Sequence, residues 1–124
     1  MYQYKAEIIR LIDGDTVEAR LDLGLHTHRV EKLRLSGIDA PEKYQVGGSL
    51  ATGWLQIQLS EENDLGSFRP VYIQTEKQDK YGRWLAWLYL DEISMRKSGY
   101  GDSLNVMMVN EGLARFYSGG KRKK

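Results

Sequence analysis

The stretch RLSGIDAPE at residues 34–42 concentrates residue types that could bind and act on a phosphate. It contains one arginine, Arg34, and two acids, Asp39 and Glu42, with Pro41 between the acids. Carboxylates supply the hard oxygen ligands that Ca²⁺ or Mg²⁺ prefers, and a second acid can orient or deprotonate a water. Arginine offers a planar fork that grips two phosphate oxygens. Taken singly, each residue is explained as a solvated charge or a turn former, so only their joint occurrence indicates chemistry.

Two further motifs could supply partners for this stretch. The tetrapeptide DGDT at residues 13–16 is a strong hairpin-turn signal, and most such turns are only turns. Asp15, however, has the parity of the apolar residues that follow it, and an unpaired carboxylate facing a core is costly. The pentapeptide DKYGR at residues 79–83 also predicts a turn, and it carries a second arginine, Arg83.

Together the three motifs suggest metal-assisted cleavage of a phosphodiester bond. In this hypothesis carboxylates hold a cation, and the cation and two arginines neutralise the charge of the pentacovalent phosphorane. A glutamate would manage the attacking water.

Four stretches, in order along the chain, resemble the staphylococcal (micrococcal) nuclease family, also called the thermonuclease family. They are IDGDT, RLSGIDAPE, DKYGRWLAWLYLD and LNVMMVNEGLA, and the resemblance covers residues 8–117. It implies an oligonucleotide-binding (OB) barrel with Ca²⁺-dependent nuclease activity. Family members cut DNA and RNA, favour single strands and leave 3′-phosphate ends.

Carried over by position, the resemblance implies a role for each matching residue. The direct Ca²⁺ ligands would be Asp15, Asp39 and the carbonyl of Ala40, with Asp13 and Thr16 just outside them. The catalytic groups would be Arg34, Glu42 and Arg83. The substrate-binding groups would be Lys80, Tyr81 and Tyr117. Glu42 would act as general base on the attacking water. Arg34 would hold the scissile phosphate, and Arg83 would stabilise the transition state and leaving group.

Two other classes of function stay open at this point. Barrels of this type also serve as non-catalytic nucleic-acid-binding or protein-interaction modules. A retired nuclease should have lost at least one of its catalytic or metal-binding side chains. None of the five is missing, namely Asp15, Arg34, Asp39, Glu42 and Arg83. The sequence therefore favours an enzyme.

Hydrophobic periodicity predicts the elements that must position these residues. Three strands are expected first, at residues 4–12, 15–22 and 27–36, followed by a helix at 49–59 and a polar loop at 61–67. Two more strands follow at 71–76 and 84–90, and a final helix at 103–112. Asp102 or Ser103 can cap the last helix. This order predicts an α+β fold, a five-stranded Greek-key OB barrel with one helix after the third strand and one after the fifth.

Length and charge suggest one domain with an uneven charge distribution. The 124 residues predict a single nuclease-like domain at residues 1–118 and a basic, disordered tail at 119–124. Residues 1–62 contain 7 basic and 10 acidic residues, a net charge of −3, whereas residues 63–124 contain 11 and 7, a net charge of +4. A fold that joins the halves could set carboxylates beside a phosphate-attracting surface.

The remaining composition bounds the environment of the protein. There is no cysteine, hence no disulfide and no thiolate zinc site. No apolar run approaches the roughly 18 residues that span a bilayer, and the N-terminus carries no signal-peptide pattern. We therefore expect no membrane partner and, if the chain is complete, a cytoplasmic location. A monomer is a separate expectation that these observations do not bear on.

Overall fold

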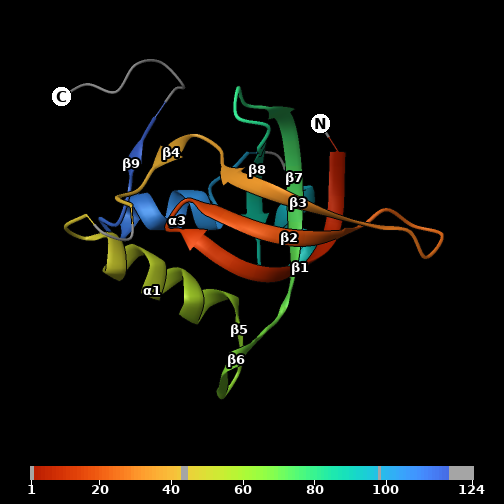
Figure 1. The fold of residues 1–124 in the computed structure, drawn as a ribbon, viewed down its shortest axis with the longest axis horizontal. Coiled ribbons are helices and arrows are strands. Elements are labelled where there is room, and N and C mark those ends of the chain that lie inside the picture. The colour runs from red at the N-terminus through yellow and green to blue at the C-terminus, as the bar shows by residue number, and fades with distance from the viewer. Residues whose placement is uncertain (1, 43–44, 98, 118–124) are drawn as a thin grey trace.

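A closed barrel of five strands forms the centre of the protein (Figure 1). The barrel strands are β1 (Tyr2–Asp13), β2 (Thr16–Asp22), β3 (His28–Leu35), β7 (Pro70–Gln78) and β8 (Trp84–Tyr89). Their order around the barrel is β1-β2-β3-β8-β7, and β7 pairs back to β1. Only the β3–β8 pair is parallel among these strands. The predicted five-stranded barrel with helices is confirmed.

The computed structural model describes residues 2–42, 45–97 and 99–117. The basic tail predicted at residues 119–124 lies outside these ranges. Within them, no helix is both long enough and apolar enough to cross a membrane.

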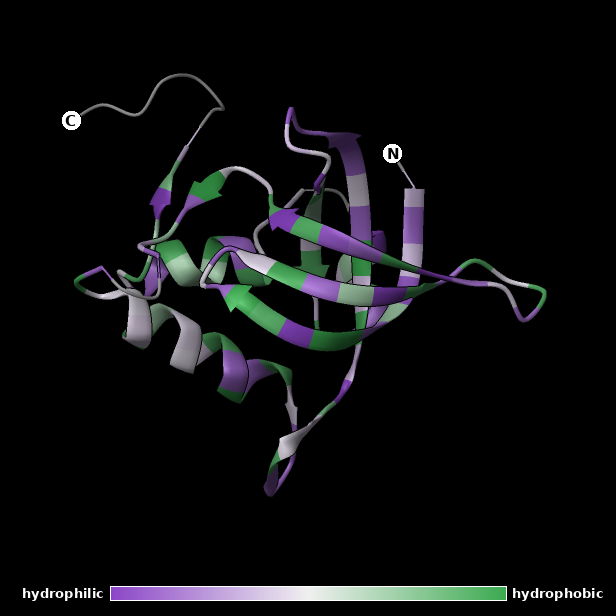
Figure 2. Cartoon of the chain, viewed as in Figure 1, coloured by the Kyte–Doolittle hydropathy of each residue, from purple (hydrophilic) through white to green (hydrophobic). Residues whose placement is uncertain are grey.

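The barrel interior follows from strand alternation, with one break that the structure explains. Along β2, Val17, Ala19 and Leu21 point into the core, as their spacing predicts. In β1 the buried positions shift from Ala6 and Ile8 to positions of opposite parity, because a bulge between residues 8 and 10 inserts one extra residue. The resulting bands of hydrophobic and hydrophilic residues are visible along the strands in Figure 2.

Helix α1 (Gly48–Leu59) packs against the barrel beside the β1–β2 turn. It buries Ala51, Leu55 and Leu59, which share one helix face at a spacing of four residues. The turn approaches this face so closely that a Cβ on Gly14 would lie 2.8 Å from the Cβ of Ala51. A glycine at position 14 therefore lets the turn of the DGDT motif sit directly on the helix.

Helix α3 (Leu104–Asn110) covers the end where β3 and β8 run in parallel. Of the two predicted caps, Ser103 is the one used, and its hydroxyl accepts a hydrogen bond from the Val106 N–H at 3.2 Å. Asn105 is fully buried and joins three backbone groups. Its Oδ1 accepts from Leu88 N–H at 3.0 Å, and its Nδ2 donates to the carbonyls of Ser36 at 2.9 Å and Ala86 at 3.0 Å.

Several short elements differ from the sequence-based expectation. The polar loop expected at residues 61–67 is wrong, because this segment forms a hairpin of β5 (Ser60–Glu61) and β6 (Asp64–Phe68). The structure also contains the five-residue helix α2 (Glu92–Arg96), which Asp91 caps and which is too short to show a periodic pattern. The pair β4 (Ile38–Asp39) and β9 (Arg115–Phe116) has two residues per strand and depends wholly on tertiary pairing.

We expect Asn105→Ala to lower the free energy of unfolding by roughly 2–4 kcal/mol, because it strips partners from three buried backbone groups. The matched control is Asn110→Ala, the same substitution at an exposed position of α3. Urea unfolding of both variants measures the difference. If the two variants have equal stability, Asn105 does not tie the helix to the barrel.

Candidate active site

An open cavity of about 1360 Å³ lies where β2, β3 and the β7–β8 turn meet. Ten of the eleven residues predicted for the site line it: Asp13, Asp15, Thr16, Arg34, Asp39, Glu42, Lys80, Tyr81, Arg83 and Tyr117. The eleventh, Ala40, is not among the lining residues, but its N–H donates a hydrogen bond to Asp15, which is. The fold thus gathers residues from both halves of the chain, while their chemical roles stay predictions.

Asp15 follows the β1–β2 turn and lies inside the fold, only 6% exposed. The Thr16 hydroxyl donates to its Oδ1 at 3.0 Å, and the Ala40 N–H donates to its Oδ2 at 2.9 Å. Thr16 is itself buried, with its hydroxyl directed at this carboxylate. These bonds satisfy an aspartate that strand parity directs inward.

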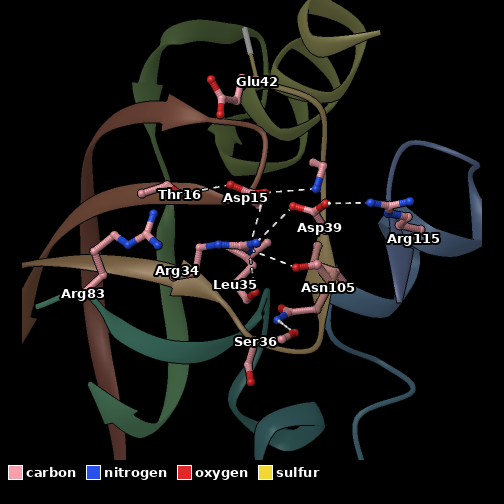
Figure 3. Close-up of polar contacts among 12 residues, drawn as sticks. Asp15, Thr16, Arg34, Leu35, Ser36, Asp39, Glu42, Arg83, Asn105 and Arg115 are labelled. Atoms are coloured by element: carbon pink, nitrogen blue, oxygen red, sulfur yellow. Dashed lines mark hydrogen bonds and ion pairs between the residues drawn. The ribbon is translucent and has the colours of Figure 1, made fainter. Parts of the chain in front are cut away.

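Arg34 connects the two buried aspartates (Figure 3). Its Nη1 lies 3.4 Å from Oδ2 of Asp15, and its Nη2 lies 3.3 Å from Oδ1 of Asp39. Nη1 also donates to the carbonyls of Leu35 at 3.1 Å and Ile38 at 2.9 Å. The side chain is 11% exposed, so neutral acceptors and charged partners together fix its guanidinium.

The turn between Arg34 and Asp39 requires a glycine. Gly37 has a φ of +76°, and a Cβ there would lie 2.8 Å from Cη2 of Trp87. This sharp turn lets the chain double back, so that an arginine and an aspartate five residues apart form an ion pair. The same turn presents the Gly37 carbonyl to the N–H of Tyr117, at 2.8 Å.

A fourth charged residue, Arg115, joins Asp15, Arg34 and Asp39 from the short strand β9. In the β4–β9 pair Arg115 stands opposite Asp39, and its Nη2 lies 3.5 Å from Oδ2 of that aspartate. Figure 3 shows it approaching Asp39 from the side away from Arg34. Sequence reasoning missed Arg115, because 76 residues separate the partners and no local pattern marks them.

Arg83 also lines the cavity, at the end of the β7–β8 turn, and Asp79 holds its side chain. The Asp79 carboxylate accepts the Arg83 Nε–H at 2.8 Å and the backbone N–H groups of Tyr81 at 2.9 Å and Arg83 at 3.0 Å. Burial by itself would raise the pKa of the Asp79 carboxyl. The hydrogen bonds and the charge of Arg83 outweigh that effect and hold this pKa below its ordinary value.

The remaining predicted residues surround this core of charges. Lys80 and Tyr81 occupy the β7–β8 turn, where Tyr81 is exposed and the Lys80 Nζ lies 5.2 Å from the centre of its ring. Glu42 lies on the segment between β4 and α1, and its N–H donates to Oε1 of Gln45 at 2.9 Å. Asp13 ends β1 beside the same cavity.

The donor set of this site suits a hard cation. Asp15 and Asp39 supply carboxylate oxygens at one place, on either side of Arg34. In the described part of the chain, however, no group of three or more His, Asp or Glu residues could hold a metal by itself. Ca²⁺ takes six to eight oxygen ligands, so carbonyls and water would have to complete the shell. The open cavity leaves room for that water.

Comparison with known proteins fits this arrangement. The family model described as staphylococcal nuclease homologue matches residues 32–124. The chain belongs to this family. It is 31% identical over 114 residues to the micrococcal nuclease of Shigella flexneri, covering 92% of this chain and 59% of that protein. It is 32% identical over 112 residues to the thermonuclease of Staphylococcus intermedius, covering 86% and 55%.

A third relative carries a different name. Protein ParB of Escherichia coli is 29% identical over 115 residues, covering 93% of this chain and 58% of that protein. The chain thus spans less than two thirds of the length of each of these three curated relatives. Membership in the staphylococcal nuclease family confirms the resemblance that the four sequence motifs indicated.

We expect Asp79→Asn to destabilise the protein by about 1–2 kcal/mol at pH 7, because Arg83 loses its charged partner. The pKa of Asp79 is lower in the folded than in the unfolded protein, so its stabilisation is present above the unfolded pKa of about 3.9. It is lost as the pH falls through the lowered folded value. Thermal unfolding at pH 7 and near pH 3 should show the difference between variant and wild type shrinking.

Asp102→Asn is the control for this prediction, because Asp102 is exposed and its carboxylate lies 3.8 Å from Nζ of Lys97. A gap between Asp79→Asn and wild type that stays constant down to pH 3 would contradict the assignment.

Proposed function

We propose that this protein is a Ca²⁺-dependent nuclease that hydrolyses phosphodiester bonds in single-stranded or locally opened DNA or RNA and leaves 3′-phosphate ends. The observation that carries the proposal is the pair of buried carboxylates, Asp15 and Asp39, bridged by Arg34 at the wall of an open cavity. Membership in the staphylococcal nuclease family supports it, and two of the relatives are named as nucleases.

In this proposal Asp15, Asp39 and the carbonyl of Ala40 hold the cation. Bound Ca²⁺ would add positive charge where the phosphate becomes more negative in the transition state. The Ala40 N–H bond to Asp15 keeps residue 40 beside both carboxylates. The hydrogen bonds from Thr16 and Ala40 hold the Asp15 carboxylate in a fixed orientation, which supports its role as a ligand.

The two arginines come from different elements, Arg34 from β3 and Arg83 from the residue before β8. Arg34 is anchored by two backbone carbonyls, so its charge is fixed before substrate arrives. Arg83 is oriented by Asp79, and its guanidinium would stabilise the phosphate and the departing oxygen. A phosphate bound in the cavity would meet the positive charge of both arginines.

Glu42 is the proposed general base. It would accept a proton from the attacking water, whose oxygen forms the new bond to phosphorus. The P–O5′ bond breaks, and the leaving oxygen takes up a proton to become the 5′-hydroxyl. The balance is the addition of one water across one phosphodiester bond, with a 3′-phosphate and a 5′-hydroxyl as products.

The cavity wall also supports a preference for unpaired nucleotides. Tyr81 is exposed beside Lys80, and Tyr117 lines the same cavity. Aromatic rings stack on bases only when those bases are not already stacked in a duplex, and lysine complements the backbone phosphates. A single strand or an opened duplex can satisfy both contacts.

The central test is digestion of single-stranded DNA with Ca²⁺, with a chelator and with Glu42→Gln. We expect cleavage with Ca²⁺, no cleavage in chelator, and a loss of about 100-fold or more in Glu42→Gln. Glu111→Gln, at the exposed end of α3, is the matched control and should cut normally.

Each contrary result rejects a different part of the proposal. Cleavage that persists in chelator rejects the metal mechanism, and full activity of Glu42→Gln rejects the assignment of the base. A protein that binds single-stranded DNA without cutting it in any buffer is a non-catalytic binding module.

We expect Arg83→Lys to reduce cleavage about 10- to 100-fold, because lysine keeps the charge but not the planar fork. Arg96→Lys is the control, since Arg96 forms an exposed ion pair with Glu92 on α2. Initial rates on a short single-stranded oligonucleotide measure both. A rate within twofold of wild type would remove Arg83 from the mechanism.

A further inference from the structure

Asp39 has an arginine on each of its carboxylate oxygens. Oδ1 lies 3.3 Å from Nη2 of Arg34, and Oδ2 lies 3.5 Å from Nη2 of Arg115. The aspartate is only 6% exposed. Of the residues predicted for metal binding, Asp39 is therefore the one whose two oxygens face two different cationic side chains.

Two aspartates and two arginines form this cluster, and their charges sum to zero without a metal ion. Asp15 and Asp39 together carry −2, and Arg34 and Arg115 together carry +2. Buried carboxylates need such compensation, because an unpaired buried charge is strongly destabilising. A divalent cation at the same oxygens would bring the summed charge of these four residues to +2. Repulsion from the arginines would then weaken cation binding unless one of them moves away.

The two arginines are not equally able to leave. Arg34 is 11% exposed, and its Nη1 donates to two backbone carbonyls as well as facing Asp15. Arg115 is 58% exposed, and Asp39 is the one ion-pair or hydrogen-bond partner of its guanidinium among the residues that the structure describes. Its attachment to the fold runs through the backbone of β9, which does not require the side chain.

We infer that Arg115 is a displaceable counter-ion of Asp39: it neutralises the carboxylate when no cation is present and gives way when Ca²⁺ binds. Arg115 thereby lowers the Ca²⁺ affinity of the site. The inference rests on the proposed function for the identity of the cation, and it adds a positioning residue that competes with the metal for one ligand.

The test is direct titration of Ca²⁺ by isothermal calorimetry on the whole chain, without nucleic acid. We expect Arg115→Gln to bind Ca²⁺ about three- to tenfold more tightly than wild type, since a half-exposed competing charge is removed. Arg115→Lys keeps the charge and should lie closer to wild type. Arg96→Gln removes the same charge at an exposed pair on α2 and should stay within twofold of wild type.

Thermal unfolding with chelator and with Ca²⁺ provides a second readout. Arg115→Gln should melt lower than wild type in chelator, where Asp39 has lost a counter-ion, and should gain more from added Ca²⁺. A variant that unfolds in chelator but refolds with Ca²⁺ also supports the inference. A variant that is unfolded in both conditions overturns it, because Arg115 would then be needed for the fold itself.

The contrary outcomes separate this inference from the proposed function. If Arg115→Gln and Arg96→Gln bind Ca²⁺ equally, Arg115 does not compete for Asp39, and the nuclease proposal is unaffected. If the wild-type chain binds no Ca²⁺ at all, the metal mechanism and this inference fail together.

Discussion

The bridge that Arg34 forms between Asp15 and Asp39 is the constraint on which the site depends. Two carboxylates that lie almost completely inside the fold would repel each other and resist desolvation without a cation between them. Arg34 supplies that charge and is held in turn by backbone carbonyls. The protein can therefore keep both carboxylates buried and close together. Arg115 completes the neutralisation from the outside.

The barrel holds the residues of this bridge in position. Asp15 leaves the β1–β2 turn, and its carbonyl accepts the Leu35 N–H at 2.7 Å, so the turn is tied to the end of β3. The same end of β3 pairs in parallel with β8, and Asn105 clamps that junction from α3. Strand pairing and one buried amide thus hold the geometry on which the Arg34 bridge depends.

The second wall of the cavity is built by a more local rule. Asp79 organises the β7–β8 turn by accepting hydrogen bonds from residues two and four positions later, including the side chain of Arg83. That wall needs little support from the barrel, whereas the Asp15–Arg34–Asp39 wall needs almost all of it. The cavity is thus lined both by residues that the barrel holds in place and by residues of one locally organised turn.

The sequence by itself determined the barrel and the motif residues, because strand alternation, turn residues and four ordered motifs are all local signals. It could not determine the β5–β6 hairpin, whose strands are mostly exposed and show no alternation, or helix α2, which is five residues long. Only the tertiary structure decided that Arg115 faces Asp39, because two-residue strands pair through contacts made elsewhere in the fold. Which charges neutralise one another depends on distances in the folded protein, and these distances cannot be read from positions along the sequence.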